Sequence, residues 1–316
     1  MRFFLVTGGA GFIGSNLVEY LLKKGEKVRI IDNFLTGKKE NINIFKNDIE
    51  IIEGDLRNQK LMKNSLKKIT HVIHLAAIPF LIESIKNPQK ISKNNILGTI
   101  SLFDNISKFY SKNIEKIVQA SSSSVYGDVK KIPIKENIRI NPLSPYAVDK
   151  ASQELYANVF SYIYKLNVVS LRFFNVYGKR QNIKSEYSGV ISKFLNRIKN
   201  NKKIHVYGDG NAIRDYIYIK DLVRGIYYSS IRENKNLHQI FNLGSEKSVS
   251  VNDLISLIKK IIKKPIFVEY KKERIGEIKK SVADISNMKN IFKYDIKYSL
   301  EEGLNEYIDY FFYKIK

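Results

Sequence analysis

Short apolar runs alternate with longer amphipathic stretches through the first half of the chain. The runs have the length of strands and lie at 2–7, 28–32, 49–55, 71–77 and 116–121. The helix-like stretches between and after them lie at 15–25, about 88–111 and 145–164. Strands that alternate with helices predict an α/β fold with a Rossmann-like, doubly wound parallel sheet. Ligands of such sheets bind beyond the carboxyl ends of the strands, so we expect site residues directly after these runs.

The pattern changes after a sixth strand, which we predict within 167–178. Beyond it the regular alternation weakens, and the chain mixes short strands with helices. We therefore expect a first domain over 1–177 and a smaller mixed α/β lobe over 178–316, with some segments of the second part returning to the first domain.

The composition is that of a globular chain, since 44% of its 316 residues are hydrophobic. It contains no cysteine, which excludes disulfides and thiolate metal sites and fits a reducing compartment. The first apolar run is too short for the core of a signal peptide, and no run reaches the roughly 18 residues of a membrane span. We expect a cytoplasmic protein without membrane attachment.

Charge and histidine content narrow the possible partners. The net charge is +23, from 54 basic and 31 acidic residues. The lysines form scattered pairs and no block of like charge, so nucleic acid is not the expected partner. The histidines His71, His74, His205 and His238 show no recognised spacing of metal ligands. We expect no metal site.

A glycine-rich turn follows the first strand and precedes the first helix. Gly9, Gly11 and Gly14 match the GxGxxG spacing that brings a pyrophosphate close to a helix N-terminus. Asp32 ends the next strand 18 residues after Gly14, near the spacing of a carboxylate that binds ribose hydroxyls. Asn33 follows it without an adjacent arginine, which favours NAD over NADP. Lys38 and Lys39 nevertheless lie close enough in sequence to reach a 2′-phosphate.

Tyr146 and Lys150 lie four residues apart in a predicted helix and therefore share one helix face. A lysine ammonium beside the phenol is expected to lower its pKa from about 10, which would make Tyr146 a proton shuttle. A serine run at 121–124 follows the fifth strand, and one of its hydroxyls could bind the reacting oxygen. An ordinary Tyr and Lys on one helix face, and serines that merely fill a turn, are the alternatives. No histidine partners the serines in sequence, so a hydrolase triad has little support.

Taken together, ten motifs in one order resemble the extended short-chain dehydrogenase/reductase family, in particular its nucleotide-sugar 4-epimerases. They are VTGGAGFIGSNLVEYLL, IDNF, GDLRN, HLAA, NNILGT, SSSSVYGD, PLSPYAVDKASQELY, LRFFNVYGKRQ, VYGDGNAIRDYIYIKDLV and RIGEIKKSVADIS. They span nearly the whole chain. The resemblance implies NAD as a bound prosthetic group in the first domain and a UDP-sugar in the second lobe. It also implies a homodimer that pairs the helices near 94–111 and 145–164 in a four-helix bundle.

The resemblance also implies roles for individual residues. Tyr146, Lys150 and Ser122 would be catalytic, with Ser123 as a possible substitute for Ser122. NAD would be bound by Gly8, Gly11, Phe12, Ile13, Gly14, Asp32, Asn33, Gly37, Asp55, Leu56, Leu75, Ala76, Ala77, Asn95, Tyr146 and Lys150. The sugar nucleotide would be bound by Ser122, Ser123, Tyr146, Asn175, Val190, Tyr207, Arg214, Arg274, Glu277 and Ser281.

The chain departs from the family pattern at two places. Glu277 stands where the family often has Asp, and the stretch 76–88 lacks the commoner serine-containing version. Ser281 corresponds to a position that borders the sugar's C2 substituent, where a small residue leaves room for an N-acetyl group. The resemblance therefore implies 4-epimerisation of UDP-N-acetylglucosamine and UDP-N-acetylgalactosamine. Whether UDP-glucose, UDP-galactose and uronic acid forms are further substrates stays open at this point.

Two other functions stay open at this point. Family members that dehydrate or decarboxylate their substrate typically carry acidic residues where this chain has Ser123 and Ser124. Serine is a poor acid or base for dehydration, so the epimerase interpretation is favoured. A relative that binds RNA or senses NAD without catalysis would fit the charge of +23 but leaves the intact Tyr146–Lys150 pair unexplained.

Overall fold

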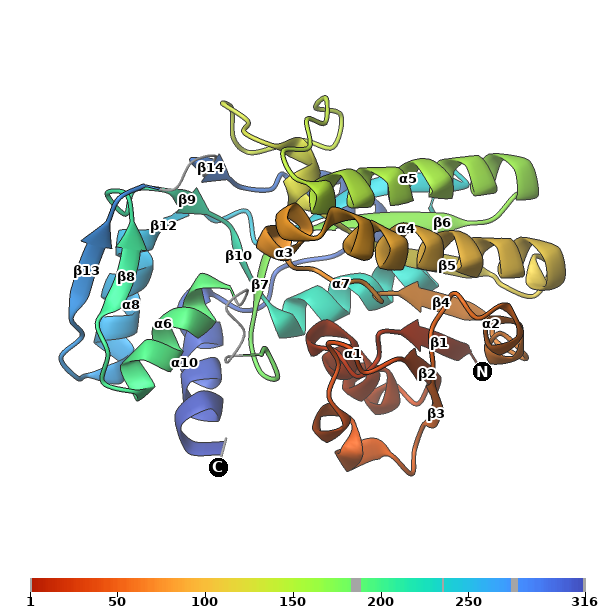
Figure 1. Cartoon of the computed structure of the whole chain (residues 1–316), viewed down its shortest axis with the longest axis horizontal. Coiled ribbons are helices and arrows are strands. Elements are labelled where there is room, and N and C mark those ends of the chain that lie inside the picture. Colours follow the sequence, from red (N-terminus) through yellow and green to blue (C-terminus); the bar gives the residue numbers. More distant parts are fainter. Residues whose placement is uncertain (1, 183–188, 235, 274–277, 315–316) are drawn as a thin grey trace.

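A seven-stranded parallel sheet forms the centre of the protein (Figure 1). The computed structural model describes residues 2–182, 189–234, 236–273 and 278–314. In spatial order the strands are β11 (His238–Leu243), β6 (Val168–Phe173), β5 (Lys116–Ser122), β4 (His71–His74), β1 (Phe3–Thr7), β2 (Lys27–Asp32) and β3 (Glu50–Glu53). The order reverses between β1 and β4, as in a doubly wound sheet. The predicted fold class is confirmed.

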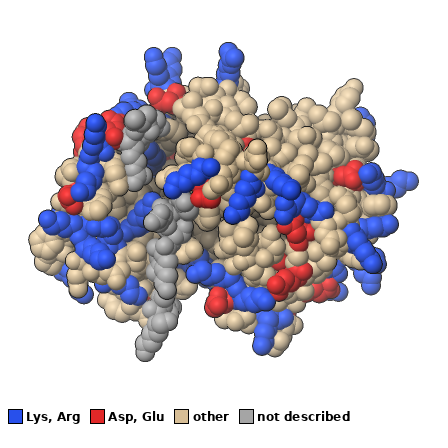
Figure 2. Space-filling model, viewed as in Figure 1, with Lys and Arg blue, Asp and Glu red and all other residues tan. Residues whose placement is uncertain are grey.

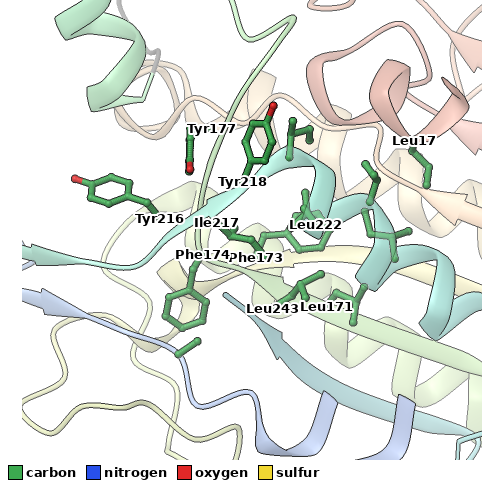
Figure 3. Packing of buried hydrophobic residues seen from close by; sticks show 14 of the residues in the cluster. Leu17, Leu171, Phe173, Phe174, Tyr177, Tyr216, Ile217, Tyr218, Leu222 and Leu243 are labelled. Carbon is green, nitrogen blue, oxygen red and sulfur yellow. The ribbon is translucent and has the colours of Figure 1, made fainter. Parts of the chain in front are cut away.

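Helices cover both faces of this sheet. One face packs on α1 (Phe12–Lys23) and α7 (Ile219–Ile231), and the other on α2 (Gln59–Ser65), α4 (Pro88–Asn105) and α5 (Pro145–Tyr164). A π-helical turn, Ile106–Tyr110, extends α4. Figure 3 shows Leu171 of β6 and Leu243 of β11 on the α7 side, facing Leu222. Burying both faces explains why the strands are continuous apolar runs.

The start of α5 is fixed by local sequence. The Ser144 side chain accepts a hydrogen bond from the Ala147 backbone N–H, and Pro145 occupies the first turn, where its missing N–H costs nothing. This cap sets where the helix begins, and thereby which way Tyr146 and Lys150 face. The short helix α3 (Leu81–Lys86) packs beside this end of α5 (Figure 1).

The second lobe contains short strands and small sheets. Its elements are β7 (Asn175–Tyr177), α6 (Val190–Lys199), β8 (Ile204–Tyr207), β9 (Ile213–Arg214), β10 (Tyr216–Tyr218), β12 (Val249–Ser250), α8 (Val251–Ile262), β13 (Val268–Lys271), β14 (Lys280–Ser281) and α10 (Leu300–Asp309). The helix α9 (Ser286–Phe292) instead packs against β11 of the large sheet. β10 pairs with β7, β9 lies between β12 and β14, and β13 pairs with β8. Although β11 lies late in the chain, it adds a strand to the large sheet, whereas β8 and β13 stand apart from it (Figure 1).

The surface carries its positive charge without concentrating it. Figure 2 shows Lys and Arg spread over both lobes of the visible face, with Asp and Glu between them, and few charges over α5. Within the described part of the chain, no helix has the length and apolar character to cross a membrane. The scattered pattern agrees with the lysine pairs seen in the sequence.

Candidate active site

A cavity of about 830 Å³ lies along the carboxyl edge of the large sheet and reaches the second lobe. It is lined by the turns after β1, β2, β3, β4 and β5 and by residues of β7, β9 and β14. Of the predicted site residues it gathers Gly8, Gly11, Phe12, Ile13, Gly14, Asp32, Asn33, Asp55, Leu56, Leu75, Ala76, Ala77, Ser122, Ser123, Tyr146, Lys150, Asn175, Arg214 and Ser281. One cavity thus joins residues from both lobes.

The glycine turn is shaped by close backbone contacts. Gly8 has φ +71°, and a Cβ there would lie 2.9 Å from the Ala76 backbone. A Cβ on Gly14 would lie 2.1 Å from the Gly8 carbonyl oxygen, so no larger residue fits. The turn leads directly into the N-terminus of α1. This arrangement fits the pyrophosphate of a dinucleotide, which approaches backbone N–H groups at a helix start.

Asp32 is held at the end of β2 by two backbone donors. Its carboxylate accepts hydrogen bonds from Ala10 N at 2.9 Å and Phe34 N at 2.8 Å, while burial raises its pKa. A Cβ on Gly37 would lie 2.9 Å from both carboxylate oxygens, so Gly37 leaves room for Asp32 without lining the cavity. The carboxylate is therefore oriented before any ribose binds.

The two lysines that could reach a 2′-phosphate differ in position. Lys39 forms a salt bridge with Glu53 at 2.8 Å, whereas Lys38 lines the cavity. Farther along, Asp55 binds Arg57 through both oxygens, at 2.8 and 2.6 Å, and this arginine lowers its pKa to about 2. Asp55 is thus ionised, and Arg57 balances its charge.

Tyr146, Ser122 and Lys150 meet at the centre of the cavity. Ser122 and Tyr146 both line it, and although burial raises the pKa of the Tyr146 phenol, the Ser122 side chain acts to lower it. The Lys150 ammonium donates to the Ala120 carbonyl at 2.7 Å and lies 6.0 Å from the centre of the Tyr146 ring. The three predicted catalytic residues are therefore brought together by α5 and the end of β5.

The prediction that Lys150 lowers the pKa of the Tyr146 phenol is wrong for the protein chain by itself. Removal from water raises the pKa of Tyr146 to about 12, and the hydrogen bond with Ser122 opposes this only in part. Burial also lowers the pKa of Lys150 to about 8, since desolvation disfavours its charged form. Sequence spacing placed the two residues correctly but carried no information about the desolvation of either group.

A buried network that the sequence did not reveal holds the loop after β4 against α5. Asn95 is buried and does not line the cavity; it donates to Asp149 at 3.1 Å and to the Ile78 carbonyl at 3.3 Å. It also accepts from Ile78 N at 2.8 Å. Ser84 accepts from Tyr146 N at 3.1 Å. Asn95 therefore positions the loop beside Tyr146, and its predicted contact with NAD stays a prediction.

A second unpredicted cluster lies one turn beyond Lys150 on α5. Glu154 binds Arg172 of β6 through both carboxylate oxygens, at 2.8 and 2.6 Å, and both residues are buried. Glu154 also accepts from the Ser121 hydroxyl at 2.5 Å. Ser121 directly precedes Ser122, so the cluster fixes the strand that carries Ser122 against the helix that carries Tyr146.

The histidines have structural partners. His74 is buried between the hydroxyls of Thr7 and Thr99, at 2.8 and 2.9 Å, and burial lowers its pKa to about 3. It therefore links β4 to β1 and α4 as a neutral ring. The described residues contain no group of three His, Asp or Glu side chains that could hold a metal ion.

On the side of the second lobe, Arg214 and Ser281 are direct partners in the β9–β14 pair and both line the cavity. Asn175 joins them by donating to the Asp215 carbonyl at 3.0 Å. Asp215 is buried and accepts from Ala283 N at 3.1 Å and from Ser245 N at 2.6 Å. This carboxylate ties together the segments that carry Arg214 and Ser281 with the loop after β11, and burial raises its pKa.

Of the four other residues predicted to bind the substrate, the two that the structure describes lie outside this cavity lining. Val190 begins α6 and is not part of the cavity lining. Tyr207 ends β8 and lines a separate hollow of about 200 Å³. Arg274 and Glu277 lie outside the described residues.

Comparison with known proteins agrees with this geometry. The family described as GDP-mannose 4,6 dehydratase matches residues 5–307. A protein of Methanocaldococcus jannaschii, described as a putative UDP-glucose 4-epimerase, is 37% identical over 309 residues that cover 97% of each chain. The chain belongs to the extended short-chain dehydrogenase/reductase family.

Solved structures of this family are similar over almost their whole length. The UDP-glucose 4-epimerase of Thermotoga maritima has a TM-score of 0.93 and 33% identity, covering 100% of both chains. The UDP-N-acetylglucosamine 4-epimerase of Methanobrevibacter ruminantium, solved with UDP-N-acetylmuramic acid, also has a TM-score of 0.93, with 38% identity and 99% of both chains covered. Other similar structures contain NAD, and some similar proteins are named dehydratase or decarboxylase. The glycine turn and Asp32 of this short-chain dehydrogenase/reductase fit NAD.

Proposed function

We propose that the protein is an NAD-dependent 4-epimerase of UDP-sugars that accepts N-acetylated hexosamines. The observation that carries the proposal is the single cavity, which joins the dinucleotide-type glycine turn, the Ser122–Tyr146–Lys150 group and Ser281 of the second lobe. The epimerase names of the similar proteins support the reaction type. The protein residues supply proton transfer and positioning, while the cofactor supplies the redox chemistry.

In the proposed reaction, Tyr146 as phenolate takes the proton of the sugar O4 hydroxyl, and Ser122 donates a hydrogen bond to that oxygen. When bound, NAD supplies a reversible acceptor for the C4 hydride and a positive ring charge that opposes the effect of burial on the Tyr146 pKa. The 4-keto sugar then presents its other face, and Tyr146 returns the proton to O4 as C4 regains its hydride. Substrate and product have the same composition, so no co-reactant is consumed.

Room for an N-acetyl group is proposed from Ser281. Its small side chain lies in the cavity lining beside Arg214, the residue suited to a paired interaction with phosphate. The N-acetylglucosamine epimerase name of one relative with 38% identity agrees with this assignment.

The test is to incubate the enzyme with UDP-N-acetylglucosamine and UDP-glucose and to identify the products. For Ser281→Tyr, we expect turnover of the N-acetylated substrate to be lost through steric overlap, while any turnover of UDP-glucose remains. Ser281→Ala is the matched control and should retain both. Equal losses on the two sugars in Ser281→Tyr would remove Ser281 as the determinant. Formation of a 4-keto-6-deoxy or decarboxylated product would instead favour the dehydratase or decarboxylase functions.

We further propose that the enzyme is a homodimer that pairs α4 and α5 with their counterparts in a second copy. The exposed face of α5 is apolar at Val148, Leu155, Tyr156, Val159, Tyr162 and Ile163. Figure 2 shows few charges over this helix, and an unpaired apolar face of this kind marks an interaction site. Light scattering after gel filtration should give the mass of two chains, and Leu155→Glu should give one. A monomeric wild type would contradict the proposal.

A further inference from the structure

A turn of the second lobe is fastened to the first helix of the large sheet. After β7 the chain runs through residues 178–182, here named the crossing segment, and passes beside α1 (Figure 1). The Asn16 side chain on α1 donates to the Lys179 carbonyl at 3.0 Å. The crossing segment therefore lies against α1, although β7 itself pairs with β10 of the second lobe.

Glu19, also on α1, holds the side chains of the crossing segment. Its carboxylate accepts from the Lys179 ammonium at 2.8 Å and from the Arg180 guanidinium at 2.7 Å. Lys23, one turn farther along α1, donates to the other carboxylate oxygen at 2.8 Å. Burial raises the pKa of Glu19, but the hydrogen bonds from these cations outweigh it and lower the pKa to about 2. The carboxylate is therefore charged at neutral pH.

Arg180 lies on the cofactor side of the cavity. Its guanidinium also donates to the Ser15 carbonyl in the first turn of α1, at 3.2 Å, and lies 5.4 Å from the ring centre of Phe45, between β2 and β3. Arg180 lines the same cavity as the glycine turn. Its backbone has φ +66°, which residues other than glycine seldom adopt. Such conformations persist where surrounding contacts hold them, and they are frequent at ligand clamps.

The other end of the crossing segment is held in the second lobe. Gln181 donates to the Val176 carbonyl at 3.3 Å and accepts from the Ser192 hydroxyl of α6 at 2.6 Å. Ser192 shares a further hydrogen bond with Tyr307 of α10, at 2.9 Å. Arg180 and Gln181 both line the cavity, so moving the segment away from α1 would widen the cavity beside the glycine turn.

We propose that Glu19 is a positioning residue for the cofactor: by fastening the crossing segment to α1, it retains NAD in the cavity. Glu19 does not line the cavity, so it acts through Arg180 and Lys179 and not by contact with the dinucleotide. The proposal rests on NAD as the cofactor. It is independent of which sugar the enzyme epimerises, because cofactor release is measured without substrate.

A purely electrostatic role of this cluster predicts the opposite sign. If the cations only attract the negatively charged pyrophosphate, removal of the Glu19 charge should strengthen NAD binding. If Glu19 positions the crossing segment, the same change leaves Lys179 and Arg180 without their shared counter-charge. The segment then separates from α1, and NAD is released faster.

The experiment loads the enzyme with isotopically labelled NAD, dilutes it into excess unlabelled NAD and follows the release of label. We expect Glu19→Gln to speed release roughly 5- to 150-fold, the usual range for a coupling between two sites. Lys23→Gln is the matched control, because Lys23 donates to the same carboxylate but belongs to α1 itself. It should release NAD at nearly the wild-type rate.

Arg180→Gln cuts the same link from the other side and leaves α1 unaltered. It should also speed release, and the double variant Glu19→Gln, Arg180→Gln should be little faster than the faster single variant. Unchanged release from Glu19→Gln, or from Arg180→Gln should Glu19→Gln fail to fold, overturns the proposal. Slower release from Glu19→Gln overturns it in favour of charge attraction alone. Equal acceleration in Lys23→Gln, or effects that multiply in the double variant, would also contradict it.

Discussion

Two successive turns of α5 carry buried charges with opposite roles. Lys150 and Glu154 lie four residues apart on one face of the helix, and each is 4% exposed. Glu154 is neutralised by Arg172 through two hydrogen bonds, whereas Lys150 is held by the uncharged carbonyl of Ala120. The Glu154 turn therefore stabilises the fold. The Lys150 turn keeps a costly charge beside Tyr146, as expected of a group retained for chemistry.

The largest effect is expected on activity, from a substitution in the cavity. Tyr146→Phe should lower kcat by about 10²- to 10⁴-fold, because it removes the proton path and little else. NAD binding, measured by calorimetry on cofactor-stripped enzyme, should be nearly unchanged. A Phe variant with almost full activity would place the base elsewhere.

At the turn of α5 that carries Glu154, loss of one member of the ion pair with Arg172 should lower the stability of the fold. Glu154→Gln leaves Arg172 buried without its counter-charge, which is expected to lower the free energy of unfolding by about 3–5 kcal/mol. Urea denaturation measures the change. The control is the double variant Glu154→Gln, Arg172→Met, which should be less destabilised than the sum of the two single variants. Additive losses would show that the two side chains do not act as a pair.

Lys150→Met should raise the stability of the fold, whereas Glu154→Gln should lower it. The pKa of Lys150 is lowered from 10.5 to about 8 by burial, so its protonated form opposes folding at pH 7. Removing the charge should raise the free energy of unfolding by about 1–3 kcal/mol while activity is largely lost. A destabilised Met variant would mean that the bond to Ala120 outweighs the desolvation of the ammonium.

The lowered pKa of Lys150 also predicts a small dependence of the free energy of unfolding on pH. Between pH 8 and 10.5 the unfolded chain binds the Lys150 proton more strongly than the folded chain does. Stability should therefore rise with pH across this window relative to Lys150→Met, whose curve lacks the contribution. The difference between the two urea-denaturation series isolates the lysine from other titrating groups. A difference that stays constant from pH 7 to 10 would argue against a desolvated lysine.

Sequence patterns predicted the sheet because each strand and helix is encoded by its own residues. They did not predict that β11 is the seventh strand, since the apolar pattern of His238–Leu243 indicates a strand but not its partner. The glycine turn and the Tyr146–Lys150 pair could also be predicted, because each is defined by spacing within one short segment.

The supporting residues could not be read in this way. Glu154 meets Arg172, and Asn95 meets Ile78, only once helices and strands have packed. The predicted direction of the Tyr146 pKa shift was wrong for the same reason, because desolvation is a property of the folded chain. Local sequence thus predicted the glycine turn and the Tyr146–Lys150 spacing better than the buried contacts of Asn95 and Glu154.

The central claim is that C4 of the sugar loses and regains its hydride within one cavity. The direct test uses a UDP-sugar substrate carrying deuterium at C4, incubated with the enzyme in ordinary water, with the product analysed by NMR and mass spectrometry. The proposed mechanism predicts a C4 epimer that keeps the deuterium at C4. Loss of deuterium to solvent, or its appearance at C6 of a 4-keto-6-deoxy product, would contradict it.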